Sequence, residues 1–194
     1  MSSGTTSDGS PADRLADVAW PGVVVSGVGA FLAGYVLTIL VVVLGPSSTA
    51  GGIWGVLVLL AFVFYGAHNV SIDAGDVGQV NMIEEAARGG TSVPVVVFYA
   101  VPILVLLVTA VLVTTRFIDR QDPVQSMGAV FGIAGGYALV AAAGTFVFTS
   151  NTIFGDSARP VLSEAVAFGL VYPVVFGTIG AALVGVATVV REGT

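Results

Sequence analysis

The feature that most constrains this chain is a series of five long apolar blocks. They run over residues 20–44, 52–70, 94–115, 124–149 and 165–190, and none of them contains an acidic residue, a lysine or an arginine. A helix needs roughly 20 residues to cross a hydrocarbon core of about 30 Å, so all five blocks are long enough, the second only just. They are too long for the strands of a membrane barrel and lack the alternation of such strands. The sequence therefore predicts an all-α fold, a polytopic transmembrane bundle of five helices.

The composition favours a membrane as the solvent. Only 9% of the residues are charged, whereas a soluble domain carries about 25%. The net charge is −6, all six basic residues are arginine, and cysteine is absent. An acidic, lysine-free surface keeps its hydration in concentrated salt, so we expect a halophilic source. The shortage of basic residues argues against nucleic-acid binding, and the lack of cysteine excludes disulfides and thiolate sites.

The segments outside the five blocks are short and polar. Residues 1–19 are rich in Ser, Gly, Thr and Asp, which predicts a disordered tail. Residues 76–88 predict a short amphipathic helix that lies on the membrane surface or on the bundle, with Asp76 as its cap and Gly89 at its end. With five spans, three arginines fall on each side of the membrane. This tie leaves the orientation open, and the arginines nearest to span ends favour a cytoplasmic C-terminus.

Small residues recur every four positions in three of the blocks and predict where the helices pack. Each series lies along one helix face, where another backbone can approach closely. The positions are Gly22, Ser26, Ala30 and Gly34 in the first block, Gly128, Gly132 and Gly136 in the fourth, and Gly177, Ala181 and Gly185 in the fifth. The third block has no glycine. It is therefore predicted to lie outside the other three and to face lipid, with residues such as Val105 at its surface.

The single histidine marks a candidate polar site at the end of the second block. Tyr65, His68 and Asn69 have the i, i+3 and i+4 spacing of one helix face, and Asp73 follows closely. One interpretation is a site for a proton or a small ligand at the mouth of the bundle. The other is an ordinary helix end at the membrane surface, where amphipathic side chains commonly lie.

No motif predicts an enzyme. Glu84, Glu85 and Arg88 invite comparison with intramembrane proteases that use a Glu-Glu pair followed by arginine, but the arginine is one position too close. A metal-dependent protease also needs more nitrogen ligands than one histidine. We therefore expect no catalytic, cofactor-binding or metal-binding residue. Ion-coupled carriers usually place ionisable groups inside their spans, and no carboxylate or arginine lies inside a block. The sequence is still compatible with a channel for a neutral solute or with a subunit of a larger complex.

Two short stretches carry a resemblance to a known group. They are Gly34-Tyr35-Val36-Leu37 in the first block and Phe62-Val63-Phe64-Tyr65-Gly66-Ala67-His68 at the end of the second. In these stretches the chain resembles an uncharacterised family of small haloarchaeal multi-pass membrane proteins, some of whose members are labelled transporters. The resemblance extends over most of residues 20–190. Members carry Asn where Gly66 stands, so the polar cluster is thinner here. The resemblance implies a haloarchaeal membrane protein and no particular activity.

Together these observations predict a multi-pass protein of the cell membrane that is not an enzyme and has a structural or partner-binding role. The alternative is a component of a small-solute transporter or channel. The expected partners are the lipid bilayer and either another membrane protein or further copies of the chain.

Overall fold

The computed structural model describes residues 10–44, 53–89, 93–118, 122–151 and 157–192. The helices are α1 (Pro11–Ala16), α2 (Trp20–Leu44), α3 (Ile53–Gly66), α4 (Met82–Arg88), α5 (Val95–Phe117), α6 (Pro123–Val147) and α7 (Leu162–Glu192). Three short strands, β1 (Ile72–Asp73), β2 (Gln79–Val80) and β3 (Arg159–Pro160), form an antiparallel sheet in the order β2-β1-β3, and the 3-10 turn η1 (Gly75–Val77) joins β1 to β2.

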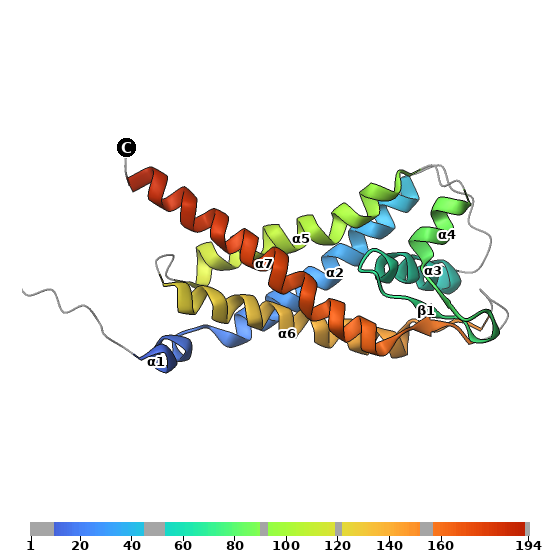
Figure 1. The fold of residues 1–194 in the computed structure, drawn as a ribbon, viewed down its shortest axis with the longest axis horizontal. Coiled ribbons are helices and arrows are strands. Elements are labelled where there is room, and N and C mark those ends of the chain that lie inside the picture. The colour runs from blue at the N-terminus through green and yellow to red at the C-terminus, as the bar shows by residue number, and fades with distance from the viewer. Residues whose placement is uncertain (1–9, 45–52, 90–92, 119–121, 152–156, 193–194) are drawn as a thin grey trace, which may run out of the picture.

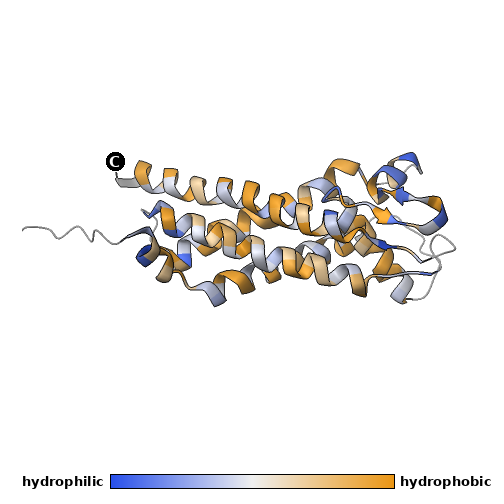
Figure 2. Ribbon diagram, turned by 60° about the horizontal axis from the view of Figure 1, so that its bottom comes forward, coloured by the Kyte–Doolittle hydropathy of each residue, from blue (hydrophilic) through white to orange (hydrophobic). Residues whose placement is uncertain are grey.

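Four long helices, α2, α5, α6 and α7, form an elongated bundle (Figure 1). Helix α1 and the C-terminal end of α7 lie at one end of it, which we call the tail end. The strands, α3 and α4 lie at the other, which we call the hairpin end. Hydrophobic residues cover the long helices, and hydrophilic residues gather near the two ends (Figure 2). This distribution is what a bilayer requires, because charges are costly at its centre.

The structure gives four candidate membrane spans among the described residues, and the fifth predicted span is not confirmed. The four apolar segments are 23 to 29 residues long. The block at 52–70 instead forms α3, which has 14 residues. At about 1.5 Å per residue, α3 is roughly 21 Å long, shorter than a hydrocarbon core of about 30 Å.

Two glycines bring α2 and α6 into backbone contact. A Cβ atom at Gly27 would lie 2.1 Å from the carbonyl oxygen of Ile133, and one at Gly136 would lie 2.1 Å from that of Val24. No side chain fits at either distance, so the two helices approach as closely as backbones can. Such an approach gains dispersion contacts, which replace the hydrophobic effect as the force between helices in lipid.

The other predicted packing positions vary in their surroundings. A Cβ atom at Gly22, Gly34, Gly128, Gly132 or Gly177 would meet Phe117, Phe64, Leu15, Val23 or Val130, whereas one at Gly185 would meet nothing within 4 Å. Ala30 is buried, and Ser26 and Ala181 are partly buried.

The prediction that the third block lies outside the bundle and faces lipid is wrong. Helix α5 packs against both α2 and α7, and Val105 is only 9% exposed. A Cβ atom at Gly180 of α7 would lie 2.8 Å from Cβ of Ala110. The glycine that permits the close approach is thus supplied by the partner helix, so the lack of glycine in α5 was a misleading signal.

The predicted disordered tail is wrong for the residues just before α2, because they contain α1, whereas residues 1–9 lie outside the described residues. Ser10 caps α1 in a capping box with Asp13, an arrangement that satisfies free amides of the first turn. The side chains of Leu15 and Val18 lie against Gly128 of α6. This contact fixes α1 to the tail end of the bundle.

The connection between α3 and α5 contains a helix shorter than the predicted one. Helix α4 begins at Met82, because Asn81 accepts a hydrogen bond from the amide of Ile83 at 2.9 Å and caps it. Asp76 lies in η1 instead, so its assignment as the cap is wrong. Arg88 forms ion pairs with Glu84 and Glu85 on the same helix. Such pairs are typical of an exposed helix surface.

Candidate functional site

The candidate site lies at the tip of a hairpin that enters the bundle and returns to the same end. Helices α2 and α6 are parallel, because Val23 lies beside Gly132 and Val28 beside Gly136, so both end at the hairpin end. The chain leaves α2 there, forms α3, and returns to β1, which pairs with β3 just before α7 begins. We call residues 53–73 the re-entrant hairpin (Figure 1).

The tip of the re-entrant hairpin is well inside the bundle. His68 contacts Tyr137, which lies ten residues before α6 ends at Val147, and Asn69 contacts Tyr172, ten residues after α7 begins at Leu162. At about 1.5 Å per residue, both pairs place the tip roughly 15 Å from the ends of these helices. Non-helical backbone at such a depth is tolerated only when protein or a water-filled cavity surrounds it.

The hairpin turns because Asn69 ends the helical conformation. Its φ is 60°, in the left-handed region, which asparagine adopts more readily than most residues. The amide of Val70 then donates to the carbonyl of Tyr65 at 3.0 Å, and the amide of Asn69 donates to that of Gly66 at 2.9 Å. These two bonds are the Schellman pattern that closes a helix C-terminus. The helix therefore ends within a continuous apolar block because of the backbone conformation of Asn69.

His68 is enclosed and uses both ring nitrogens. It is 4% exposed. Nδ1 lies 2.8 Å from the carbonyl oxygen of Phe64, and Nε2 lies 2.5 Å from the hydroxyl of Tyr137. A carbonyl oxygen only accepts, so Nδ1 carries the proton and Nε2 of the neutral ring accepts from the Tyr137 hydroxyl. The rings of Phe64 and Tyr172 lie against the imidazole, with centroids 4.7 and 5.0 Å away.

The neighbouring polar groups of the hairpin also bond to the long helices. The Tyr65 hydroxyl donates to the carbonyl of Ala141 at 2.6 Å, and the Asn69 amide donates to the Tyr172 hydroxyl at 2.8 Å. On the returning strand, the Ser71 amide donates to the carboxylate of Glu164 at 2.6 Å. Among the described residues, no buried side-chain nitrogen or oxygen is without a hydrogen-bond partner. The tip is thus a bonded junction between the hairpin, α6 and α7.

The structure brings three of the four predicted site residues to the tip and separates the fourth from it. Tyr65, His68 and Asn69 contribute to the junction: Tyr65 and His68 bond to α6, and Asn69 bonds to α7. Asp73 lies in β1, paired in register with Arg159 of β3. It lines a polar pocket of about 180 Å³ at the hairpin end, together with Gln79, Thr145, Phe146, Arg159, Pro160, Val161 and Leu162. Asp73 and Arg159 form no ion pair within 4 Å in the described chain.

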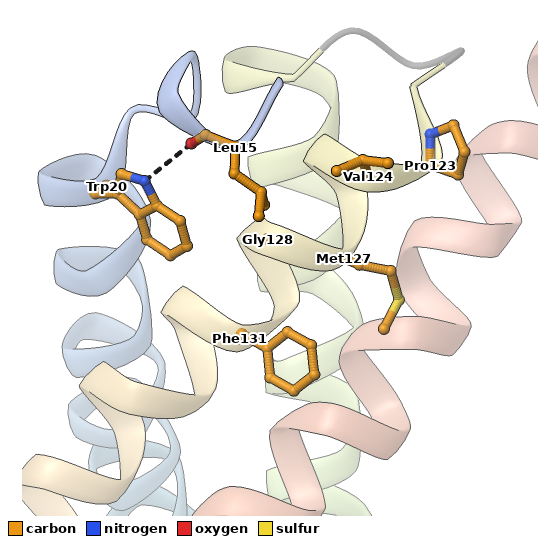
Figure 3. Close-up of a pocket in the computed structure, with 7 residues that line it drawn as sticks. All are labelled: Leu15, Trp20, Pro123, Val124, Met127, Gly128 and Phe131. Atoms are coloured by element: carbon orange, nitrogen blue, oxygen red, sulfur yellow. Dashed lines mark hydrogen bonds between the residues drawn. The ribbon is translucent and has the colours of Figure 1, made fainter. Parts of the chain in front are cut away.

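A second, apolar pocket of about 460 Å³ lies at the tail end, between the start of α2 and the first turns of α6 (Figure 3). Its side chains are those of Leu15, Trp20, Pro123, Val124, Met127 and Phe131, with Gly128 at its wall. The Trp20 indole N–H donates to the carbonyl of Leu15 at 3.1 Å and is therefore occupied. Among the described residues, no charged side chain lines this pocket, so its described walls offer a ligand apolar contact.

The sequence did not reveal the residues that complete the junction, Tyr137, Tyr172 and Glu164. One signal pointed to Tyr137, because Gly-Tyr occurs both at Gly34-Tyr35 and at Gly136-Tyr137. The two tyrosines have related roles, since the Tyr35 hydroxyl donates to the carbonyl of Leu57 at 2.7 Å, so that each bonds to the re-entrant hairpin. The helices that carry them are parallel.

The model of a family of unknown function, DUF7978, matches residues 1–188. No curated protein and no solved structure matches the chain.

Proposed function

The chain belongs to DUF7978, a family of unknown function, and on that premise we propose that it is a non-enzymatic protein of the cell membrane that binds a partner within the bilayer. The observation that supports this proposal is the state of His68, whose two ring nitrogens are both bonded to the protein and which is 4% exposed. An acid, a base or a proton carrier needs access to the group on which it acts. The histidine instead fixes the re-entrant hairpin to α6.

The outward face of α6 offers a surface on which a partner helix fits. Phe131 and Leu139 are 56% and 65% exposed there. Gly135 lies between them at four-residue spacing, and a Cβ atom at Gly135 would meet nothing within 4 Å. A glycine between two large apolar side chains forms a notch that admits a side chain of another helix, the kind of contact that joins helices in lipid.

The proposed orientation places α1 and the end of α7 in the cytoplasm. Four spans and a re-entrant hairpin put the arginines of the tail end on one side and those of the hairpin end on the other. The division is Arg14, Arg116, Arg120 and Arg191 against Arg88 and Arg159. The positive-inside rule then favours a cytoplasmic tail end, whereas the five-span count gave a tie.

The alternative, a component of a small-solute transporter or channel, has one observation in its favour. A helix interrupted at depth occurs in transporters, where the break forms a binding site, and the re-entrant hairpin of this chain is such an interruption. The polar pocket with Asp73 and Arg159 lies at its open end. Because the tip itself is enclosed, transport would require the hairpin to leave α6.

The test combines association and flux. The tagged chain is cross-linked in its native membrane, purified, and examined for a stoichiometric membrane protein or a second copy. Gly135→Leu should abolish the cross-linked product, whereas Gly55→Leu, at another position where a Cβ meets nothing within 4 Å, should not. Liposomes containing the wild-type protein should take up radiolabelled glycerol or glycine no faster than protein-free liposomes. Flux without a cross-linked product would reject the proposal in favour of the alternative.

A further inference from the structure

A groove between α2 and α5, separate from the re-entrant hairpin, opens on the side of the bundle. It has a volume of about 220 Å³. Its residues are Ser26, Gly29, Ala30 and Ala33 of α2, and Thr109, Leu112, Val113, Arg116 and Phe117 of α5. The two helices are antiparallel here, since Gly22 lies beside the ring of Phe117. Arg116 is thus at the end of the groove nearest to the tail end, and Ala33 and Thr109 are at the deeper end.

The groove is open because α2 has no large side chain along this wall. Its α2 wall consists of one serine, one glycine and two alanines, and a Cβ atom at Gly29 would meet nothing within 4 Å. The Ser26 hydroxyl donates to the carbonyl of Gly22 at 2.8 Å, so it presents little free polarity to the groove. From Thr109 to Arg116 the groove extends over seven residues, about 10 Å along the helix. This shape fits a narrow, flexible hydrocarbon chain.

Arg116 supplies a positive charge at the mouth of the groove. It lies in the last turn of α5 and is exposed, and it takes no part in the two ion pairs found among the described residues. Two carboxylates of the tail end are used for helix capping: Asp122 accepts from the amides of Val124 and Gln125, and Asp13 bonds to Ser10. Within the part of the chain that the structure describes, no carboxylate forms an ion pair with Arg116, so its guanidinium can bind an anion from outside the chain.

We propose that this groove binds an anionic phospholipid, with the phosphate on Arg116 and one acyl chain between α2 and α5. A guanidinium binds a phosphate through two parallel hydrogen bonds, and the last turn of a spanning helix is at the depth of lipid headgroups. The charge favours a lipid over a second copy of the chain. An apolar helix seated on the groove would cover Arg116 without supplying an anion, and a covered charge that has no counter-ion is unfavourable.

The test is native mass spectrometry of the delipidated protein in detergent, titrated with phosphatidylglycerol or phosphatidylcholine of identical acyl chains. The wild-type protein should retain phosphatidylglycerol at least fivefold better than phosphatidylcholine. Arg116→Gln should remove that preference, whereas Arg88→Gln, at the other end of the bundle, should keep it. Glycerol phosphate, which has the headgroup without the chains, should not compete at equal concentration.

A second pair of variants tests the groove itself. Gly29→Leu should reduce the retention of both lipids severalfold, and Gly185→Leu, at an equally open position of α7, should leave it unchanged. Circular dichroism and thermal melting show whether each variant is folded. Equal retention of the two lipids by the wild-type protein, an unchanged preference in Arg116→Gln, or full competition by glycerol phosphate would overturn the proposal. So would a dimer of the wild-type protein that Gly29→Leu converts to a monomer, since the groove would then join two copies.

Discussion

Neighbouring glycines of α6 should respond oppositely to the same substitution. A Cβ atom at Gly136 would lie 2.1 Å from the carbonyl oxygen of Val24, whereas one at Gly135 would meet nothing within 4 Å. In Gly136→Ala, an ordinary contact of 3.4 Å therefore requires a displacement of 1.3 Å (3.4 − 2.1). Both groups in conflict belong to backbones, so no change of rotamer relieves it and α2 must move away from α6.

We expect Gly136→Ala to lower the free energy of unfolding by about 3 kcal/mol, the upper part of the range for overpacked interiors. The reciprocal glycine Gly27 would lose its contact with Ile133 in the same movement, which adds to the cost. Gly135→Ala should change the free energy by less than about 1 kcal/mol, and in the stabilising direction, because alanine is the better helix former.

Unfolding by sodium dodecyl sulfate in mixed micelles, followed by tryptophan fluorescence, measures both variants. Trp20 is a suitable reporter, because a Cβ atom at Gly132 would lie 3.5 Å from its ring, at the contact between α2 and α6. Equal destabilisation by the two substitutions would refute the packing argument, since they add the same methyl group one position apart. A Gly136→Ala variant as stable as the wild-type protein would refute it as well.

Three further predictions concern the hairpin, the tail end and the topology. Tyr137→Phe removes the hydroxyl that donates to Nε2 of His68. It should lower the free energy of unfolding by about 1–2 kcal/mol in the same assay, since hydrogen bonds between membrane helices are worth up to about 1.7 kcal/mol. An unchanged free energy would mean that water replaces the hydroxyl. Gly128→Leu should displace α1 and expose the amides before α2 to proteolysis, with an unchanged cleavage pattern as the contrary result. The chain has no cysteine, so single cysteines can be introduced at Ser10, Asp76 and Thr194 and labelled with an impermeant maleimide. Cysteines at Ser10 and Thr194 should react from the same side of the membrane and a cysteine at Asp76 from the other side. A five-span topology would put Ser10 and Thr194 on opposite sides.

The sequence predicted the four long helices well, because the length of an uninterrupted apolar segment largely determines whether it can span a bilayer. Four of the five blocks form α2, α5, α6 and α7. The span predicted for the second block is not confirmed, and the reason does not show in the hydropathy of that block. Asn69 adopts a left-handed conformation that stops α3, and Tyr137 and Tyr172 provide the bonds that hold the stopped chain inside the bundle. Those partners are distant in sequence, so the local pattern could not include them.

The sequence identified several residues of the candidate site by their type but did not predict which residues they contact. A lone histidine in an apolar stretch is conspicuous, and the structure gives His68 a specific pair of partners. Asp73 was grouped with it because it is near in sequence. Pairing of β1 with β3 places Asp73 opposite Arg159 instead. Strand pairing and the depth of the hairpin determine which side chains come into contact. The spacing of apolar residues in the sequence predicts neither of them.

The bonds that hold the hairpin also set an order in which the protein is assembled. Helix α3 is synthesised before the helices to which its tip binds, and its hydrogen bonds reach partners 69, 76 and 103 residues further along the chain. Until α6 and α7 have entered the membrane, the amide of Ser71 lacks its acceptor, the carboxylate of Glu164, and an amide without a partner in lipid costs several kcal/mol. The hairpin therefore takes its final place last, although it is among the first segments to leave the ribosome.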